Sequence, residues 1–183
     1  MRSFARAAVC AAVALSLSAC LISDQPLLDP ANAGAAPLEP GSYESCERDD
    51  DGDMDDCAPL DIAREDGVYR LQPLDDEEAT LALFRPIGGG AFLAQMWGES
   101  DSDYFYFYAD AREGALRLVM IECADLPEKL RASLSRRGAL EIDDGGETCV
   151  AKTLNGAEAA ARAYKGARGI APRSVLVLTK AAE

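Results

Sequence analysis

Histidine is absent from this chain of 183 residues. Its absence removes the Ser-His-Asp and Cys-His arrangements on which many nucleophilic enzymes depend. No two cysteines have the CxxC spacing, so a zinc site made of cysteines and histidines is not expected either. We therefore predict that the protein is not an enzyme.

Other catalytic patterns are present only in incomplete form. The pairs Asp101/Asp103 and Asp143/Asp144 resemble the paired carboxylates of glycosidases, but both lie in turn-like polar stretches where acids are common. The run Gly88-Gly89-Gly90 is not followed by the Lys, Ser or Thr of a phosphate-binding loop, so it predicts a hairpin turn.

Basic residues are few, with 18 Lys and Arg against 32 Asp and Glu. The imbalance is concentrated in residues 20–66, which hold 14 acids and only two basic residues, Arg48 and Arg64. Such a negative field repels nucleic acid phosphates and attracts cations and basic proteins. We expect no binding of nucleic acid, whereas a protein or cell-wall partner remains open.

The N-terminus has the features of an export signal. Arg2 and Arg6 precede an uncharged apolar run, Ala7 to Leu17, which is about half of the ~20 residues that a membrane-spanning helix needs. The run ends in Leu17-Ser18-Ala19-Cys20, which resembles the lipobox of bacterial lipoproteins. The resemblance implies a signal peptide at 1–19, and a lipid on the Cys20 thiol with acylation of its freed amine. The alternative is an ordinary secretory signal with a cysteine present by chance.

The same resemblance implies a location. An aspartate directly after the lipidated cysteine favours retention in the inner membrane, and Leu21 stands there instead. We expect an outer-membrane protein that faces the periplasm and contacts the membrane through its covalent lipid. The inner membrane and the cell surface remain alternatives, and the resemblance covers only the signal region.

Four further cysteines, Cys46, Cys57, Cys123 and Cys149, remain in the mature chain. An even number in an oxidising compartment predicts two disulfides, with three possible pairings. The pairing of Cys46 with Cys57 and of Cys123 with Cys149 closes the shortest loops, and we expect this one.

The segment between Cys46 and Cys57 is strongly acidic. Its spacing, with oxygen ligands at Glu47, Asp49, Asp51 and Asp55, resembles the calcium loops of thrombospondin type 3 repeats and the first half of an EF-hand. Ala58 stands where an EF-hand needs its final Glu, and the motif occurs once. The resemblance implies a weak calcium site, and the alternative is a solvated acidic spacer closed by a disulfide.

Four parts of the chain differ in composition. After the signal peptide, residues 20–45 are rich in Pro, Ala, Gly and acids and have no sustained apolar period, which predicts a lipidated cysteine followed by a flexible tether. Residues 46–66 form the acidic disulfide loop with a lead-in segment. Residues 67–183 have the composition of one folded domain.

Short apolar runs separated by turn residues predict that this domain is α+β, with an antiparallel meander of about five to eight short strands and two short helices. The meander can curl into a partial barrel. The expected strands are 68–72, 79–85, 91–97, 104–108, 116–123, 139–142, 148–152 and 175–179, and the expected helices are 124–136, with Asp125 as N-cap, and 157–164.

Aromatic residues gather on two of the expected strands. Within residues 104–108 the tyrosines share one face and the phenylalanines the other, so we expect the phenylalanines in the core and the tyrosine hydroxyls at the rim or in solvent. Trp97, Tyr104, Tyr106 and Tyr108 are candidates for a binding surface for sugars or peptides.

Three functional classes fit these observations. The first, which we favour, is a non-catalytic envelope lipoprotein, lipid-anchored at Cys20, that acts as a binding or structural module. The second is a lipid-anchored inhibitor of a basic enzyme such as lysozyme. The third is a lipocalin-like carrier of a small apolar ligand, although the expected strands are short and few for a roomy barrel.

Overall fold

The structure is a computed structural model, and it describes residues 20–48, 54–74, 78–112, 114–143, 145, 148–166 and 175–181. Within these ranges all strands belong to one sheet, of which eight close into an antiparallel barrel because β6 pairs with both β5 and β7. The barrel strands are β2 (Gly41–Arg48), β3 (Met54–Glu65), β4 (Val68–Pro73), β5 (Thr80–Gly88), β6 (Ala91–Gly98), β7 (Tyr104–Arg112), β8 (Ala115–Met120) and β11 (Val175–Lys180).

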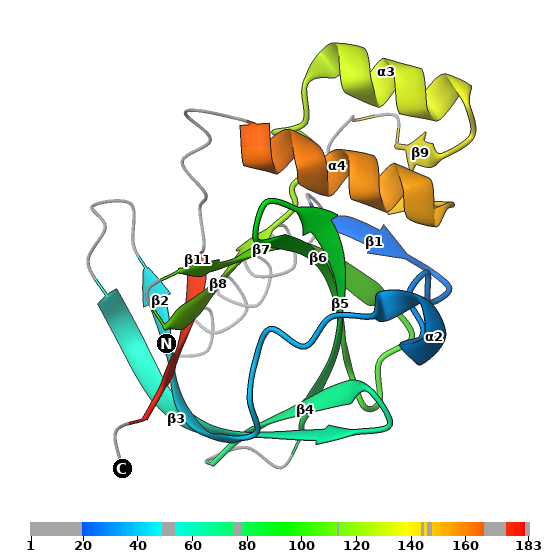
Figure 1. Ribbon diagram of the computed structural model, residues 1–183. Coiled ribbons are helices and arrows are strands. Elements are labelled where there is room, and N and C mark those ends of the chain that lie inside the picture. Colours follow the sequence, from blue (N-terminus) through cyan, green and yellow to red (C-terminus); the bar gives the residue numbers. More distant parts are fainter. Residues whose placement is uncertain are drawn as a thin grey trace, which may run out of the picture.

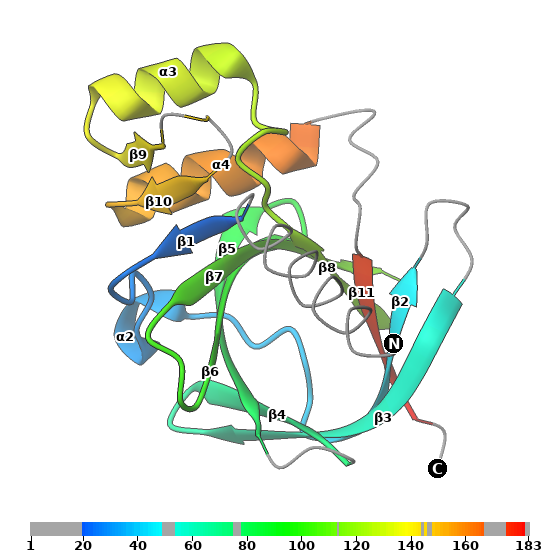
Figure 2. The same ribbon diagram turned by 180° about the vertical axis from the view of Figure 1, so that it is seen from behind.

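The remaining elements lie outside the barrel (Figure 1). They are β1 (Leu21–Ser23), α2 (Pro30–Ala33), α3 (Glu128–Arg136), β9 (Leu140–Ile142), β10 (Cys149–Ala151) and α4 (Leu154–Gly166). Strand β1 extends the sheet from β7 to β10, with which it pairs in parallel, and β9 forms the outer edge. Figure 2 shows these three strands beside α3 and α4.

The predicted α+β class fits this fold in outline, but the chain is predominantly β and the barrel is closed rather than partial. The expected meander is present as β4 to β8, and the glycine run is the β5–β6 hairpin turn, where Gly88, Gly89 and Gly90 all have positive φ. Helix α3 begins at Glu128 and not after Asp125, whose carboxylate accepts a hydrogen bond from the Tyr164 hydroxyl at 3.3 Å.

Side chains fill the middle of the barrel. Small residues on β5, β6 and β7 leave room for the rings of Tyr69 and Phe84, which are fully buried with their centroids 5.4 Å apart. Leu71 and Leu118 complete this layer. The described strands therefore surround a packed core and not a channel.

A second core lies between the outer face of the barrel and the layer formed by α3, α4, β9 and β10. The tyrosines of β7 point into it, so the expectation that their hydroxyls reach the rim or solvent is wrong for Tyr106 and Tyr108, which are buried. Burial raises the pKa of Tyr106 to about 12, so its hydroxyl stays protonated and acts as a hydrogen-bond donor.

The two disulfides have the expected pairing. The first, between Cys46 and Cys57, joins β2 to β3. The second, between Cys123 and Cys149, joins the segment after β8 to β10 and is fully buried in the second core. It therefore links the barrel covalently to the layer that covers it.

The segment expected to be a flexible tether is instead ordered and packed. Residues 21–45 form β1, α2 and most of β2, and Leu21 and Leu28 are almost completely buried. The buried side chain of Gln95, on β6, holds this segment: its Oε1 accepts hydrogen bonds from the amides of Leu27 (2.9 Å) and Leu28 (2.8 Å). Its amide donates back to the Leu28 carbonyl at 3.1 Å.

Helix α4 is fixed to the barrel by an ion-pair network around Glu158. The carboxylate accepts hydrogen bonds from Arg85 on β5 (2.5 Å) and from Arg162 one turn along the helix (2.7 Å). Arg85 also donates to the Asn32 carbonyl at the end of α2. Burial alone would raise the pKa of Glu158, but the two guanidinium groups outweigh it and hold this pKa below its ordinary value.

We expect Glu158→Gln to lower the free energy of unfolding by about 1–2 kcal/mol at neutral pH, because two charge-assisted hydrogen bonds lose their anion. A lowered folded-state pKa stabilises the fold above the unfolded-state pKa, and that contribution disappears as pH falls through the folded value. In urea unfolding, the difference in free energy of unfolding between wild type and variant should therefore decrease as the pH falls from about 6 to about 3.

The matched control is Glu141→Gln, since Glu141 is an exposed partner of Lys152 and such pairs contribute little. A difference in the free energy of unfolding that stays the same at low pH would show that the ionised carboxylate of Glu158 does not stabilise the fold.

A candidate ligand site at the open end of the barrel

The two ends of the barrel differ. At the end reached by the β3–β4, β5–β6 and β7–β8 turns, the chain between α2 and β2 crosses the opening (Figure 1). Ala35 and Leu38 of this crossing segment join the barrel core, and the Leu38 carbonyl accepts a hydrogen bond from the Tyr69 hydroxyl at 2.8 Å. We call this end the closed end. The opposite end, where β2, β4 and β6 end and β3, β5 and β7 begin, is the open end.

Two adjoining cavities occupy the open end, with volumes of about 410 and 150 Å³. They share Thr80 and Met96, so together they form a cup above the packed middle of the barrel. Each of the eight barrel strands supplies lining residues, which are mostly apolar: Ser45, Ala58, Pro59, Leu60, Leu71, Pro73, Thr80, Met96, Trp97, Gly98, Phe105, Phe107, Met120, Leu176 and Leu178, with Glu78 and Ala79 next to β5 and Asp101 in the β6–β7 connection.

Strand pairing places the largest lining side chains together. Met96 on β6 is the register partner of Phe105 on β7, and Phe107 is the partner of Met120 on β8. Partners in register put their side chains on the same face of the sheet, here the interior of the barrel. Flexible thioethers beside aromatic rings form an adaptable apolar surface.

The rim of the cup carries two carboxylates, each with a structural role. Asp101 accepts a hydrogen bond from the Gly98 amide at 3.2 Å, and Glu78 accepts hydrogen bonds from both the amide and the hydroxyl of Ser100. These contacts hold the β6–β7 connection in place. The floor of the cup has no ionisable side chain among its lining residues, so its chemistry suits the binding of an apolar group.

The four aromatic residues predicted as one binding surface are divided in the structure. Trp97 and Tyr104 lie together at the open end, with ring centroids 5.6 Å apart, and Trp97 lines the larger cavity. Tyr106 and Tyr108 are buried below the helical layer. The Tyr106 hydroxyl lies 2.8 Å from the Ser23 hydroxyl and 3.1 Å from Gln95 Oε1, so it fixes the N-terminal segment.

Cys20 also lies at the open end. Its backbone forms a bridge with Glu122, and the amide of Leu21 donates to the Ile121 carbonyl at 2.7 Å. The thiol is buried and lies 2.9 Å from Sδ of Met120, which lines the cup. Burial, with the nearby Glu122 carboxylate, raises the pKa of the free thiol.

The acidic segment predicted as a calcium loop connects β2 to β3. Asp49 and Asp51 lie outside the described residues, as does the side chain of Asp55, while Glu47 is exposed at the end of β2. The structure therefore describes only the strands from which the segment starts, with Glu47 and Asp55 as register partners.

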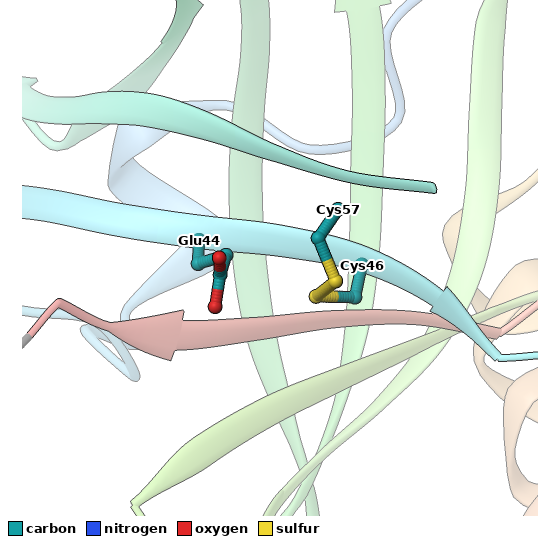
Figure 3. Close-up of side chains that lie close together, drawn as sticks. All are labelled: Glu44, Cys46 and Cys57. Atoms are coloured by element: carbon teal, nitrogen blue, oxygen red, sulfur yellow. A yellow bond between two sulfur atoms is a disulfide. The ribbon is translucent and has the colours of Figure 1, made fainter. Parts of the chain in front are cut away.

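Three side chains with metal-ligating atoms lie together on the outer face of these strands (Figure 3). They are Glu44, Cys46 and Cys57, whose ligand atoms are all within 4.8 Å of one another. The two sulfur atoms are bonded to each other, so neither is a thiolate. With the disulfide formed, this group offers a metal ion a single carboxylate and is not a metal site.

A third hollow, of about 380 Å³, lies outside the crossing segment at the closed end. Charged groups line it, including Arg112 and the ion pair between Lys180 and Glu39 (2.9 Å). Its lining is more polar than that of the cup, so it is a poorer site for a small apolar molecule.

The lining of the cup was not identified from the sequence. Its members belong to eight strands, and only pairing and barrel closure bring them to one end. One signal was present: Phe105 and Phe107 share the face of their strand that points inward, as predicted, although the other interior rings, such as Tyr69 and Phe84, lie elsewhere on the chain.

Comparisons with protein-family models, with curated proteins and with solved structures find no match to this chain. None of the helices in the described ranges is both long enough and apolar enough to cross a membrane.

Proposed function

We propose that this chain is a non-catalytic, lipid-anchored protein of the bacterial cell envelope that binds a small apolar molecule, such as an acyl chain, in the open end of its barrel. One observation carries the proposal: all eight barrel strands contribute to an apolar cup at one end, while the chain itself covers the other end. The volume of the larger cavity, about 410 Å³, is within the range of small-ligand sites.

The geometry favours a carrier or sensor of apolar molecules over an inhibitor of a basic enzyme. Short and few strands would argue against a carrier. A closed barrel of this size has room for one small ligand, and here the packed layer around Tyr69 and Phe84 limits that ligand to the open half. The inhibitor alternative is supported by net charge alone.

A neutral apolar fluorophore, N-phenyl-1-naphthylamine, tests the proposal directly. The soluble chain from residue 20 with Cys20→Ser should bind it at one site, with energy transfer from Trp97, which is the single tryptophan and lines the larger cavity. A long-chain alcohol should displace the fluorophore. Absence of saturable binding would contradict the proposed function.

The variant Thr80→Glu should weaken fluorophore binding at least about tenfold, or about 1.4 kcal/mol. Thr80 lines both cavities and is partly exposed, so the fold tolerates a carboxylate at this position. Binding of an apolar ligand would desolvate that carboxylate, which costs free energy.

The control is Thr80→Gln, which has the same size and no charge. It should keep most of the affinity, and unfolding of both variants should be compared with that of the parent. If Thr80→Glu binds as well as Thr80→Gln, the fluorophore lies elsewhere on the protein.

A further inference from the structure

Three features distinguish the open end: the position of Cys20, the distribution of exposed apolar side chains, and the charges around the cup. Cys20 is not at the end of a loose chain. Strand β1 pairs with β7 through Ile22 and Phe105, and with β10 through Leu21 and Cys149. A lipid on the Cys20 thiol would therefore be attached at a fixed point of the fold, next to Met120 on the wall of the cup.

The exposed large apolar residues point to the same end. Among the described residues these are Met54, 43 % exposed, and Leu74, 59 % exposed. Met54 begins β3 at the β2–β3 connection, and Leu74 follows β4 at the β4–β5 connection. The start of β3 and the end of β4 lie at the open end, so the anchor point, the apolar cup and these exposed apolar side chains share one face of the molecule.

The closed end has a different surface. Its turns contain Asp66, Gly67 and the run of glycines at 88–90, and Arg112 is 72 % exposed there. Such a surface gains nothing from contact with hydrocarbon, whereas exposed apolar residues around an acylated cysteine do.

We infer that the open end of the barrel is a membrane-facing surface, which docks on the bilayer that anchors Cys20 so that an apolar ligand passes between bilayer and cup without crossing water. This inference depends on the proposed function and on lipidation of Cys20. Glu47 and Asp56 are exposed at this end beside Met54, and the carboxylates of Glu78, Asp101 and Glu122 lie around it. The surface therefore suits a zwitterionic bilayer better than an anionic one.

The single tryptophan provides the test, because Trp97 lies at the open end. The full, lipidated protein is reconstituted into phosphatidylcholine vesicles that contain a lipid spin-labelled near its headgroup, and tryptophan quenching is measured. The comparison protein carries Trp97→Phe with Arg112→Trp, which moves the only tryptophan to the closed end. Quenching of Trp97 should exceed that of the relocated tryptophan by at least about twofold, because quenching requires close approach to the interface.

Equal or stronger quenching at the closed end would overturn the inference, as would failure of the protein to float with the vesicles, since the anchor is then missing. The soluble Cys20→Ser chain separates this failure from that of the proposed function. If it binds N-phenyl-1-naphthylamine while the lipidated protein shows no preference between ends, the cup binds ligands but does not face the membrane. If it binds no fluorophore, the proposed function itself fails.

Discussion

Replacing Gln95 with leucine is expected to lower the free energy of unfolding by about 4 kcal/mol. The Gln95 side chain is fully buried, and its loss removes the partner of the Leu28 amide and carbonyl and one of the two partners of the Leu27 amide, the other being the Tyr106 hydroxyl. Each buried group without a hydrogen bond costs about 1–3 kcal/mol. Urea unfolding measures the loss, and hydrogen exchange should show faster opening at residues 21–28 than in the barrel strands.

The control for this variant is Tyr106→Phe, which removes one hydroxyl from the same network. The Gln95 contacts to Leu27 and Leu28 remain, so we expect a loss of about 1 kcal/mol. If Gln95→Leu costs no more than Tyr106→Phe, the N-terminal segment is not held to the barrel in the way described.

Removing the buried disulfide by changing Cys123 and Cys149 to alanine is the second large effect. The cysteines are 26 residues apart, for which the chain-entropy model gives about 3.5 kcal/mol, and the vacated space in the second core adds to this. We expect a total loss of about 4 kcal/mol by urea unfolding, with the α3–β9–β10 layer loosening first.

The other disulfide serves as the comparison. Cys46 and Cys57 are 11 residues apart on strands that are already paired, and Cys57 is exposed. By the same model, changing both to alanine should cost about 2.8 kcal/mol, less than the total for the buried pair. Equal losses, or a larger loss for the Cys46–Cys57 pair, would contradict the role given to the Cys123–Cys149 link.

The meander was predictable because its signals are local. In residues 68–123 apolar runs alternate with turn residues, and the glycines at 88–90 mark a hairpin directly. The disulfide pairing was predictable for a similar reason, since the shortest loops cost the least entropy to close. These features depend on residues that are close in sequence, so the sequence pattern alone indicates them.

The N-terminal segment was mispredicted because its apolar residues have no common period. Leu21 packs in the second core, Leu28 beneath α2, and Leu38 in the barrel interior. Because the segment packs against three different surfaces in succession, its apolar residues follow no regular spacing. Its prolines and glycines are also typical of linkers. Its order depends on Gln95, which is about 70 residues away.

Strand β3 was missed because charge concealed its alternation. Leu60 and Ile62 point into the barrel, while Asp56 and Asp61 are exposed. Strand β2 was missed as well, and these two strands join β4 to β11 in the barrel, so the prediction left the sheet open. The cup, which needs all eight strands, could not be inferred without them.

The two proposed properties depend on different parts of the structure. Binding in the cup depends on the lining of the barrel, and orientation toward the membrane depends on the fixed position of Cys20. The Gln95→Leu variant tests both proposals, because it releases the N-terminal segment. The folded variant should keep most of its fluorophore binding. The difference in tryptophan quenching between the two ends of the barrel should become smaller.

The methionine methyl groups offer the most direct measurement of ligand binding in the cup. Of the four methionines, Met1 belongs to the expected signal peptide, Met96 and Met120 line the larger cavity, and Met54 is exposed beyond the rim. On titration of the soluble, methyl-labelled Cys20→Ser chain with a long-chain alcohol, we expect saturable shifts at Met96 and Met120 and little change at Met54. Unchanged Met96 and Met120 signals at saturating ligand, or shifts at Met54 alone, would contradict this expectation.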